Sequence, residues 1–548
     1  MQGGLQVKRI IALTLIFATV CGLFSGCASK EEEAYVPTGD ALVMEGDDPN
    51  DFILKEEVIQ ELTLAYESGR SLNPLIGISI TNRVLMSLLY QGLFAVDSKN
   101  NPTPILCSQW QVSADNMIYT FYLEETACFS DGSKVTVDDV LATYAAAKED
   151  GYYKGRFTHV ARIVPTEDGT GVQFFLNFPY ESLPMLLDVP ILKADEVAAE
   201  HPLGTGPYLY SESIGGTYLI KNPDWWATKE VDNKPLYNVE VAATADAIPL
   251  VEVADQPQVR DEFQFGDVGL AIANPMADSY AEYRCDYELW EVDSGMFLYL
   301  GVNVTYSDYF KDGGNLRHAL TYAIDRQGIV DRFYRGLAHP STLAASPGSP
   351  YYIPSMAAKY NYDPMQFLDS ISGWAPPKKK DDEAGERKLI LLVNSDDSAR
   401  LKTARYIAAT LTELGVPCGT MEYGANTNPT YEVVLRANNW DLYLGQTRLS
   451  PNYDLTEFFR GWGELSWGAI DNKDVYALVQ DSLENSGSYY NLLKDVSERA
   501  YIIPVLFGYY TVYAERGLFE NLNPARDNVF YYTLGKTMKD TQIATVYN

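Results

Sequence analysis

The sequence predicts a mixed α/β protein of two or three domains, on the basis of three observations. Segments with strand character alternate along the chain with segments of helical periodicity, which is typical of the mixed classes. The chain has 548 residues, too many for one ordinary hydrophobic core. Its hydrophobic content of 46% is that of a folded protein.

The N-terminal residues have the layout of a secretory signal. Lys8 and Arg9 precede an apolar run over 10–20 that is short for a membrane span. The stretch that follows, "LFSGC", resembles a bacterial lipobox ending at Cys27, with Phe24 where leucine is usual. The resemblance implies cleavage before Cys27 and acylation of its thiol and new amino group, which would hold the protein on a membrane. The alternatives are an ordinary signal peptide for residues 1–27 or an uncleaved anchor.

The elements then follow in order. Residues 28–50 are acidic and contain turn formers, which predicts a flexible tether. "ELTLAYESGRSLNPL" predicts a short strand and a turn into a helix at "TNRVLMSLLYQGLF". Two alternating aromatic segments, "SQWQVS" and "MIYTFYL", predict strands.

Further elements have clear boundaries. Thr136 followed by Asp139 predicts a helix N-cap with an acidic residue at its third position. "LGTGPYLY" predicts a glycine-rich turn entering a strand, and 376–388 is a charged loop. After that loop, "LILLV" predicts a buried strand and "SARLKTARYIAATLTELGV" an amphipathic helix.

Composition limits the function. The formal net charge of -32 argues against a nucleic-acid partner, because like charges repel. We expect no metal site and no cofactor, since the chain has 4 histidines and lacks CxxC, HExxH and zinc-like spacings. Cys107 and Cys128 are on segments that could be neighbouring strands, so they form either a disulfide or two small buried side chains.

Eight motifs occur in order between about residues 60 and 515, and they resemble those of the family 5 extracellular solute-binding proteins, the peptide-binding components of ABC importers. The motifs are "SLNPL" (71–75), "LLYQGLF" (88–94), the stretch "WQVSADNMIYTFYLEETACFSDGSKVTVDDV" (110–140), "GTGPY" (204–208), "NPDWW" (222–226), "LRHALTYAIDR" (316–326), "YNYDPMQFLDSISGW" (360–374) and "YIIPVLFGYYTVY" (501–513).

The resemblance implies a two-lobed, type II periplasmic-binding-protein-like clamshell with an extra satellite domain. Ligand would lie between the lobes, and two crossing strands would form the hinge. The expected parts are lobe I (51–82, 204–296 and 501–548), the satellite domain (83–203) and lobe II (297–500).

The segment "HALTYAIDR" (318–326) combines residue types used in catalysis, but its periodicity predicts a scaffold helix over 316–336. Leu316, Leu320 and Ile324 fall on one apolar face. His318 and Asp325 would be about 10 Å apart along the helix axis, too far for a proton relay.

The candidate ligand residues follow from the resemblance. "QTRLSPNYD" (446–454) follows a strand whose end should meet the cleft. Relatives usually have an aspartate early in this stretch for a peptide's ammonium group, whereas this chain has Arg448, which suits a carboxylate, a ring or a sugar. Asp454 matches a family acidic position loosely.

Each candidate has an alternative role. Arg448 could form a surface or inter-lobe salt bridge, and Gln446 could cap the strand end. Asn73 would line the lobe I side or form a turn before Pro74. Trp462 and Trp467 would form walls of the pocket or pack in the core.

The expected function is capture of a peptide or similar small solute by a monomeric lipoprotein, which delivers it to the permease subunits of an ABC importer at the extracytoplasmic face of the membrane. The same fold could instead bind an oligosaccharide, a metal chelate or a signalling peptide, or form a sensor without transport. A lipid-anchored hydrolase would need a nucleophile set or an acid pair. No nucleophile motif such as GxSxG occurs, so we expect no catalytic residues and no enzyme.

Overall fold

The computed structural model describes residues 62–530, apart from 77–78, 150, 229, 232–233, 236–244, 278, 311–314, 378–386, 469–471 and 520–521. The predicted signal segment, Cys27 and the tether are outside the described residues, as is most of the charged loop 376–388.

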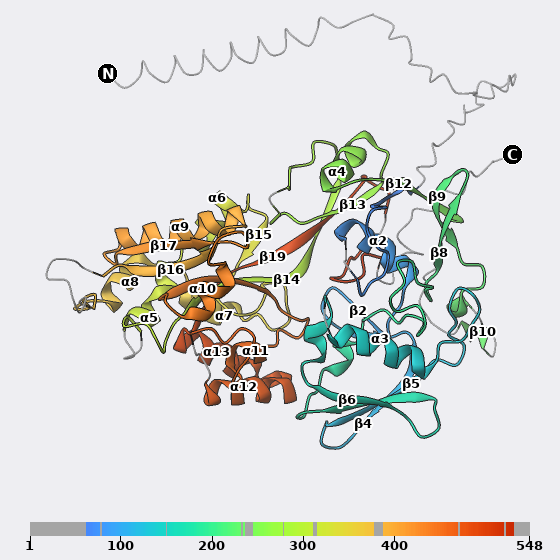
Figure 1. Cartoon of the computed structure of the whole chain (residues 1–548), viewed down its shortest axis with the longest axis horizontal. Coiled ribbons are helices and arrows are strands. Elements are labelled where there is room, and N and C mark those ends of the chain that lie inside the picture. The colour runs from blue at the N-terminus through green and yellow to red at the C-terminus, as the bar shows by residue number, and fades with distance from the viewer. Residues whose placement is uncertain are drawn as a thin grey trace, which may run out of the picture. The chain divides into compact units, whose positions relative to one another are not determined.

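One large mixed sheet organises the fold (Figure 1). Its main path runs in the order β17-β16-β18-β14-β19-β13-β1-β12-β9-β8, and β15 pairs with β19 beside it. The strands are β1 (Leu64–Tyr66), β8 (Tyr208–Ser213), β9 (Gly216–Lys221), β12 (Ala247–Glu252), β13 (Leu270–Ala273), β14 (Glu288–Val302), β15 (Ala338–Pro340), β16 (Leu389–Asn394), β17 (Cys418–Tyr423), β18 (Leu442–Arg448) and β19 (Ile502–Ala514).

Two long antiparallel strands, β14 and β19, join the two halves of this sheet. Strand β19 contains residues 502–513 of the motif "YIIPVLFGYYTVY". The pairing of β14 with β19 is interrupted between Asp293 and Phe297. Gly295 lies in this break with φ +72°, and a Cβ there would be 2.5 Å from the carbonyl oxygen of Leu449 and 2.7 Å from the Arg526 guanidinium. Glycine is therefore required on both steric and conformational grounds.

A second, four-stranded antiparallel sheet has the order β4-β5-β7-β6 and lies within the range 83–203 that was predicted as a satellite domain. Helix α3 (Val137–Glu149) packs beside it and begins at the predicted cap, where the Thr136 N–H donates to the Asp139 carboxylate at 2.7 Å. The strands of this sheet and of the two small hairpins are β2 (Phe94–Val96), β3 (Pro102–Pro104), β4 (Cys107–Val112), β5 (Ile118–Leu123), β6 (Val160–Pro165), β7 (Gly171–Leu176), β10 (Glu230–Val231) and β11 (Lys234–Pro235).

Helix α2 (Ile80–Leu89) crosses the predicted start of the satellite domain at residue 83 and packs against β1 and β13 of the main sheet. The remaining α-helices are α4 (Gln256–Phe265), α5 (Asn315–Ala319), α6 (Arg326–Phe333), α7 (Pro354–Ala357), α8 (Pro364–Ser370), α9 (Ser398–Glu413), α10 (Tyr431–Ala437), α11 (Thr456–Phe459), α12 (Lys473–Glu484) and α13 (Tyr489–Arg499). The 3-10 turns are η1 (Lys154–Phe157), η2 (Leu183–Leu186), η3 (Trp226–Thr228), η4 (Leu320–Ala323), η5 (Ala358–Tyr360) and η6 (Ser486–Ser488).

The single helix predicted over 316–336 is wrong, because the chain forms α5, η4 and α6 there. Ile324 is extended, and Asp325 caps α6 by accepting a hydrogen bond from the Gly328 N–H at 2.9 Å. The buried Arg326 guanidinium stabilises the break by donating to the carbonyl oxygens of Thr321 and Pro504. The prediction that Leu316, Leu320 and Ile324 form an apolar face is confirmed, since all three side chains are fully buried. Asp325 and Arg326 therefore have structural roles in this segment.

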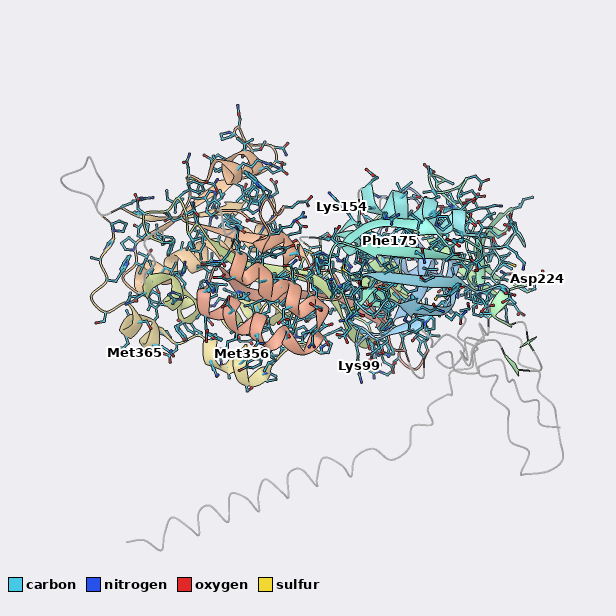
Figure 2. All side chains as sticks on the ribbon, turned by 90° about the horizontal axis from the view of Figure 1, so that it is seen from below. Lys99, Lys154, Phe175, Asp224, Met356 and Met365 are labelled. Atoms are coloured by element: carbon cyan, nitrogen blue, oxygen red, sulfur yellow. The ribbon has the colours of Figure 1, made fainter. Side chains whose placement is uncertain are left out.

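The satellite sheet and the lobe II helices share one apolar core. Buried side chains run continuously from Phe174 on β7 through Tyr453 to Phe458 on α11 and Leu492 on α13. Figure 2 labels Phe175 on the satellite sheet and Lys154 at its edge, where the Lys154 ammonium pairs with Glu464 at 3.3 Å. The four-stranded sheet thus shares its core with helices α11 and α13.

Three further features concern the classes of site considered above. In the described part of the chain, no helix combines the length and hydropathy of a membrane span. The same residues contain no group of three or more His, Cys, Asp or Glu side chains that could hold a metal ion. The Cys107 and Cys128 thiols are both free.

Candidate functional site

Strand β1 is parallel to β12 and β13, and the carboxyl end of β13 at Ala273 lines a cavity of about 240 Å³. The edge beyond the carboxyl ends of parallel strands is the usual ligand position in open α/β sheets. Polar residues in the lining include Arg83, Gln256, Asn274, Ser279, Tyr280 and Tyr510, and apolar residues such as Ile80 and Pro257 line the rest. The cavity therefore offers both hydrogen-bonding groups and apolar surface.

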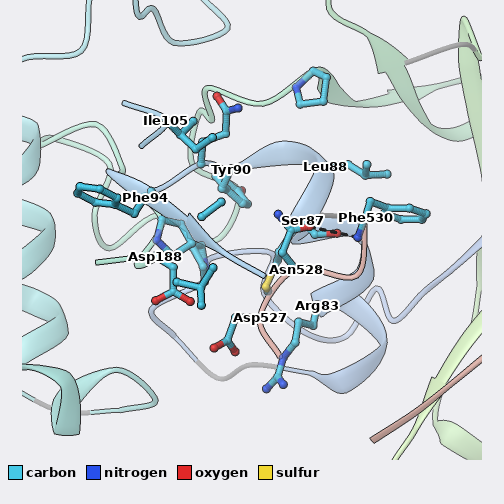
Figure 3. A pocket seen from close by; sticks show the side chains of 18 of the residues that line it. Arg83, Ser87, Leu88, Tyr90, Phe94, Ile105, Asp188, Asp527, Asn528 and Phe530 are labelled. Carbon is cyan, nitrogen blue, oxygen red and sulfur yellow. Dashed lines mark hydrogen bonds between the residues drawn. The ribbon is translucent and has the colours of Figure 1, made fainter. Parts of the chain in front are cut away.

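Arg83 also borders a second, more apolar cavity of about 100 Å³ (Figure 3). Its lining includes Leu88, Phe94, Ile105, Trp226 and Phe530. Figure 3 shows Asp188, Asp527 and Arg83 together along one side of this cavity. Arg83 therefore lies between two cavities, of which the second is the more apolar.

Arg83 is placed by helix α2, which begins at the Ser79 N-cap and buries most of its residues. Its side chain is only 7% exposed. The guanidinium carbon lies 4.6 Å from the ring centroid of Tyr152 and 5.2 Å from that of Tyr510. The Nη1 atom is buried and has no hydrogen-bond partner among the described residues. A buried guanidinium N–H without an acceptor is costly, so an anion from outside the chain would stabilise it.

Arg448, predicted to contact ligand, is the last residue of β18 and pairs with Met296 of β14. Its guanidinium carbon lies 3.6 Å from the Tyr152 ring centroid, so this ring contacts both Arg83 and Arg448. Burial lowers the pKa of Arg448 to about 10, which still leaves it charged at neutral pH. The Nη2 atom lies 3.5 Å from Asp527 Oδ1, yet it is buried without a hydrogen-bond partner in the described structure.

Two more arginines complete what we call the arginine cluster: Arg83, Arg156, Arg448 and Arg526. Arg156 of η1 forms ion pairs with Asp188 and Asp527. Arg526 donates to the carbonyl oxygens of Asp293 and Leu449 at 3.0 and 2.9 Å, and its Nη2 lies 3.2 Å from the Asp293 carboxylate. Arg526 thus fastens the C-terminal segment to the interrupted part of β14.

The cluster changes the acidity of its neighbours. Burial opposes ionisation of Asp527, but the surrounding arginines outweigh it and hold the pKa of this carboxyl below its usual value. Burial also opposes ionisation of Tyr510, and Arg83 and Arg448 together outweigh it, so the pKa of Tyr510 is lowered. The region is therefore electropositive enough to favour anions.

Gln446, the second predicted residue of this strand, precedes Arg448 by two positions and so falls on the same face of β18. Its Oε1 atom is buried and has no hydrogen-bond partner among the described residues. The two side chains thus present an unsatisfied acceptor and an unsatisfied donor on one strand face.

Asp454 is hydrogen-bonded to His159, which was not among the candidate site residues. Its carboxylate lies 2.7 Å from His159 Nε2, and both side chains are buried. It also accepts from the Thr456 N–H at 2.8 Å. Burial raises the pKa of Asp454, but the hydrogen bonds from His159 and Thr456 outweigh this effect and lower it. This carboxylate joins the satellite domain to lobe II.

The other predicted residues lie away from the arginine cluster. The Asn73 amide is fully buried, donates to the carbonyl oxygens of Val197 and Ala199, and accepts from the Leu75 N–H, so all its groups are used. Trp462 is fully exposed at φ +63°. Trp467 packs at the edge of the shared core, under the guanidinium of Arg436.

A family model described as bacterial extracellular solute-binding proteins, family 5, matches residues 101–466. The glutathione-binding protein GsiB of Escherichia coli O1:K1 is 27% identical over 325 residues, which cover 56% of this chain and 60% of that relative's own length.

Two solved structures share the fold. One is the ABC transporter substrate-binding protein CtaP of Listeria monocytogenes, with TM-score 0.64, 19% identity, and coverage of 87% of this chain and 98% of that one. The other is the oligopeptide-binding protein AppA of Bacillus subtilis in complex with a nonapeptide, with TM-score 0.57, 18% identity, and coverage of 88% and 97%.

Proposed function

Because the chain belongs to family 5 of the bacterial extracellular solute-binding proteins, we propose that it captures a small anionic solute outside the cytoplasm and delivers it to the permease of an ABC importer. A peptide or a related molecule with a free carboxylate fits this class. The protein acts as a monomer and is held at the membrane by lipid on Cys27. It binds its solute without chemical change.

The observation that carries the proposal is the pair of buried guanidiniums on Tyr152. Arg83 and Arg448 each have an N–H without an acceptor in the described structure. Charge-assisted hydrogen bonds from arginine to a carboxylate are stronger than neutral ones, and the guanidinium fork matches the two oxygens. A solute carboxylate would satisfy both donors together.

The pairing of Asp454 supports recognition of the acidic end of the solute. A peptide's ammonium group needs a free carboxylate, and the Asp454 carboxylate already binds His159 and Thr456. The GsiB relative is described as a glutathione-binding protein. A solute of this kind offers carboxylates to the arginines without requiring an acidic pocket.

Mass spectrometry of the protein purified from its own host tests the proposal. The expected result is a co-purifying solute with at least one carboxylate or other anionic group, released on denaturation. Recovery of a neutral sugar or a purely cationic solute, bound in stoichiometric amount, would contradict it.

We expect no turnover of that solute. Purified protein incubated with an excess of the identified solute should leave its amount and mass unchanged, because the family binds and releases its ligand. Steady formation of product beyond one equivalent per protein, absent from a heat-denatured sample, would make the protein an enzyme.

We expect Cys27→Ser to release the protein from the membrane fraction, since serine cannot receive the thioether-linked lipid. The measurement is fractionation and immunoblotting of the host or of a heterologous bacterium. Cys107→Ser is the matched control, and it should remain with the membrane. Equal membrane retention of both variants would show that Cys27 is not the anchor.

A further inference from the structure

Asp527 is the central counter-ion of the arginine cluster, and it comes from the segment that follows β19 rather than from the strands that build the cavity. Its side chain is 6% exposed. It accepts a hydrogen bond from the Tyr152 hydroxyl, pairs with Arg156, and lies 3.5 Å from Arg448. All four arginines act on its pKa.

The described charges in this cluster do not balance. Four guanidiniums face three carboxylates, those of Asp188, Asp293 and Asp527. One positive charge therefore remains for a solute. Without the Asp527 carboxylate, two positive charges would remain.

The pairing is also uneven. Arg156 has two carboxylates within ion-pair distance, whereas Arg448 has only the longer contact to Asp527 and Arg83 has no ion-pair partner within 4 Å among the described residues. Asp527 thus satisfies Arg156 and compensates Arg448 only in part. The excess charge is concentrated at the two guanidiniums that contact Tyr152.

We propose that Asp527 is a specificity-determining residue that limits the solute to a single negative charge at the Arg83–Arg448 pair. This inference rests on the proposed function, because it assumes that this pair binds the anionic group. A second negative charge on that group would meet no unpaired cation, and it would lie close to the Asp527 carboxylate. The site therefore distinguishes a carboxylate from a doubly charged group such as a phosphate or sulfate.

We call this limit to a single negative charge the charge rule. Two tetrahedral anions of similar shape test it. Perchlorate carries one charge and sulfate carries two, and calorimetric titration at constant ionic strength measures their affinities. In the wild type, the two affinities should lie within about threefold of each other, because the second charge of sulfate is unmatched. In Asp527→Asn, sulfate should bind roughly tenfold tighter than in the wild type while perchlorate changes less.

Two further variants separate charge from shape. Arg156→Gln combined with Asp527→Asn restores the single excess charge, so the sulfate-to-perchlorate ratio should return to that of the wild type. Asp286→Asn removes a carboxylate from an exposed ion pair with Arg516 and should leave both affinities unchanged. Circular dichroism verifies that each variant is folded, and the wild-type ratio remains a test if Asp527→Asn does not fold.

The outcomes distinguish this inference from the function on which it rests. If anion binding is lost in Arg448→Ala but the ratio is the same in the wild type and in Asp527→Asn, the charge rule is overturned and the arginine site remains. A wild type that already prefers sulfate tenfold or more overturns the rule as well. If Arg448→Ala binds both anions like the wild type, the arginine site fails and the inference fails with it.

Discussion

Arg448→Ala is expected to weaken binding of the natural solute by roughly tenfold to a hundredfold. A charge-assisted hydrogen bond in a buried site contributes about 1.5–3 kcal/mol, and each tenfold step in affinity corresponds to about 1.4 kcal/mol. Arg448→Lys should fall between the wild type and the alanine variant, because lysine keeps the charge but loses the planar fork. Titration calorimetry with the solute identified from the host measures all three.

The fold should survive this substitution. Arg156 continues to pair with Asp527, and removing Arg448 also removes the unpaired positive charge. The matched control is Arg332→Ala, which takes an exposed guanidinium from the ring of Tyr406 on another part of lobe II. Its affinity for the solute should equal that of the wild type. An Arg448→Ala protein with unchanged affinity would exclude this residue from the site.

His159→Ala should cause the largest loss of stability. It leaves the buried Asp454 carboxylate with hydrogen bonds from Thr456 alone in the described structure. Leaving a buried acceptor short of a hydrogen-bond donor costs about 1–3 kcal/mol, and more when the acceptor is charged. Chemical denaturation measures the loss, and Asp454→Asn in the same background should recover part of it. His318→Ala is the control, since its Nδ1 contacts a carbonyl oxygen at an exposed position.

The contact between Asp454 and His159 also makes the free energy of unfolding depend on pH, with a sign that follows from the pKa of Asp454. The folded-state pKa of Asp454 is lowered, so its contribution to the free energy of unfolding is fully present above the unfolded value of about 3.9. That contribution is lost as the pH falls through the folded-state value. In Asp454→Asn the acid destabilisation should therefore be smaller than in the wild type. Equal acid profiles of the two proteins would show that Asp454 does not titrate in this range.

The sequence predicted the local elements well because their patterns are local. The alternating aromatic segments form β4 and β5, the Thr136 cap begins α3, and the periodic stretch after "LILLV" forms α9. The prediction of one helix over 316–336 was wrong because apolar spacing alone does not reveal an N-cap inside the segment. Asp325 accepts from the Gly328 N–H and thereby starts a new helix inside one continuous apolar pattern.

The site was predicted only in part, because its members are distant in the sequence. The contact of Arg448 and Gln446 with a solute stays a prediction, and both residues were proposed from the strand end that carries them. Arg83 and Asp527 were not, because one lies inside an ordinary helix pattern and the other in a C-terminal segment without periodicity. The relation between Asp454 and His159 also depends on the packing of the satellite domain against lobe II. No motif in either segment indicates that contact.

The position of Asp527 in the chain has a consequence for how the protein is made. Synthesis and export proceed from the N-terminus, so Arg83, Arg156 and Arg448 have all left the ribosome before Arg526 and Asp527 exist. Until then Arg156 has Asp188 as its counter-ion, whereas Arg448 lacks the one carboxylate that lies within ion-pair distance of it in the described structure. The arginine cluster is thus among the last parts of the described chain to reach its final arrangement. On the proposed function, solute capture at these arginines must wait for the segment that contains Asp527.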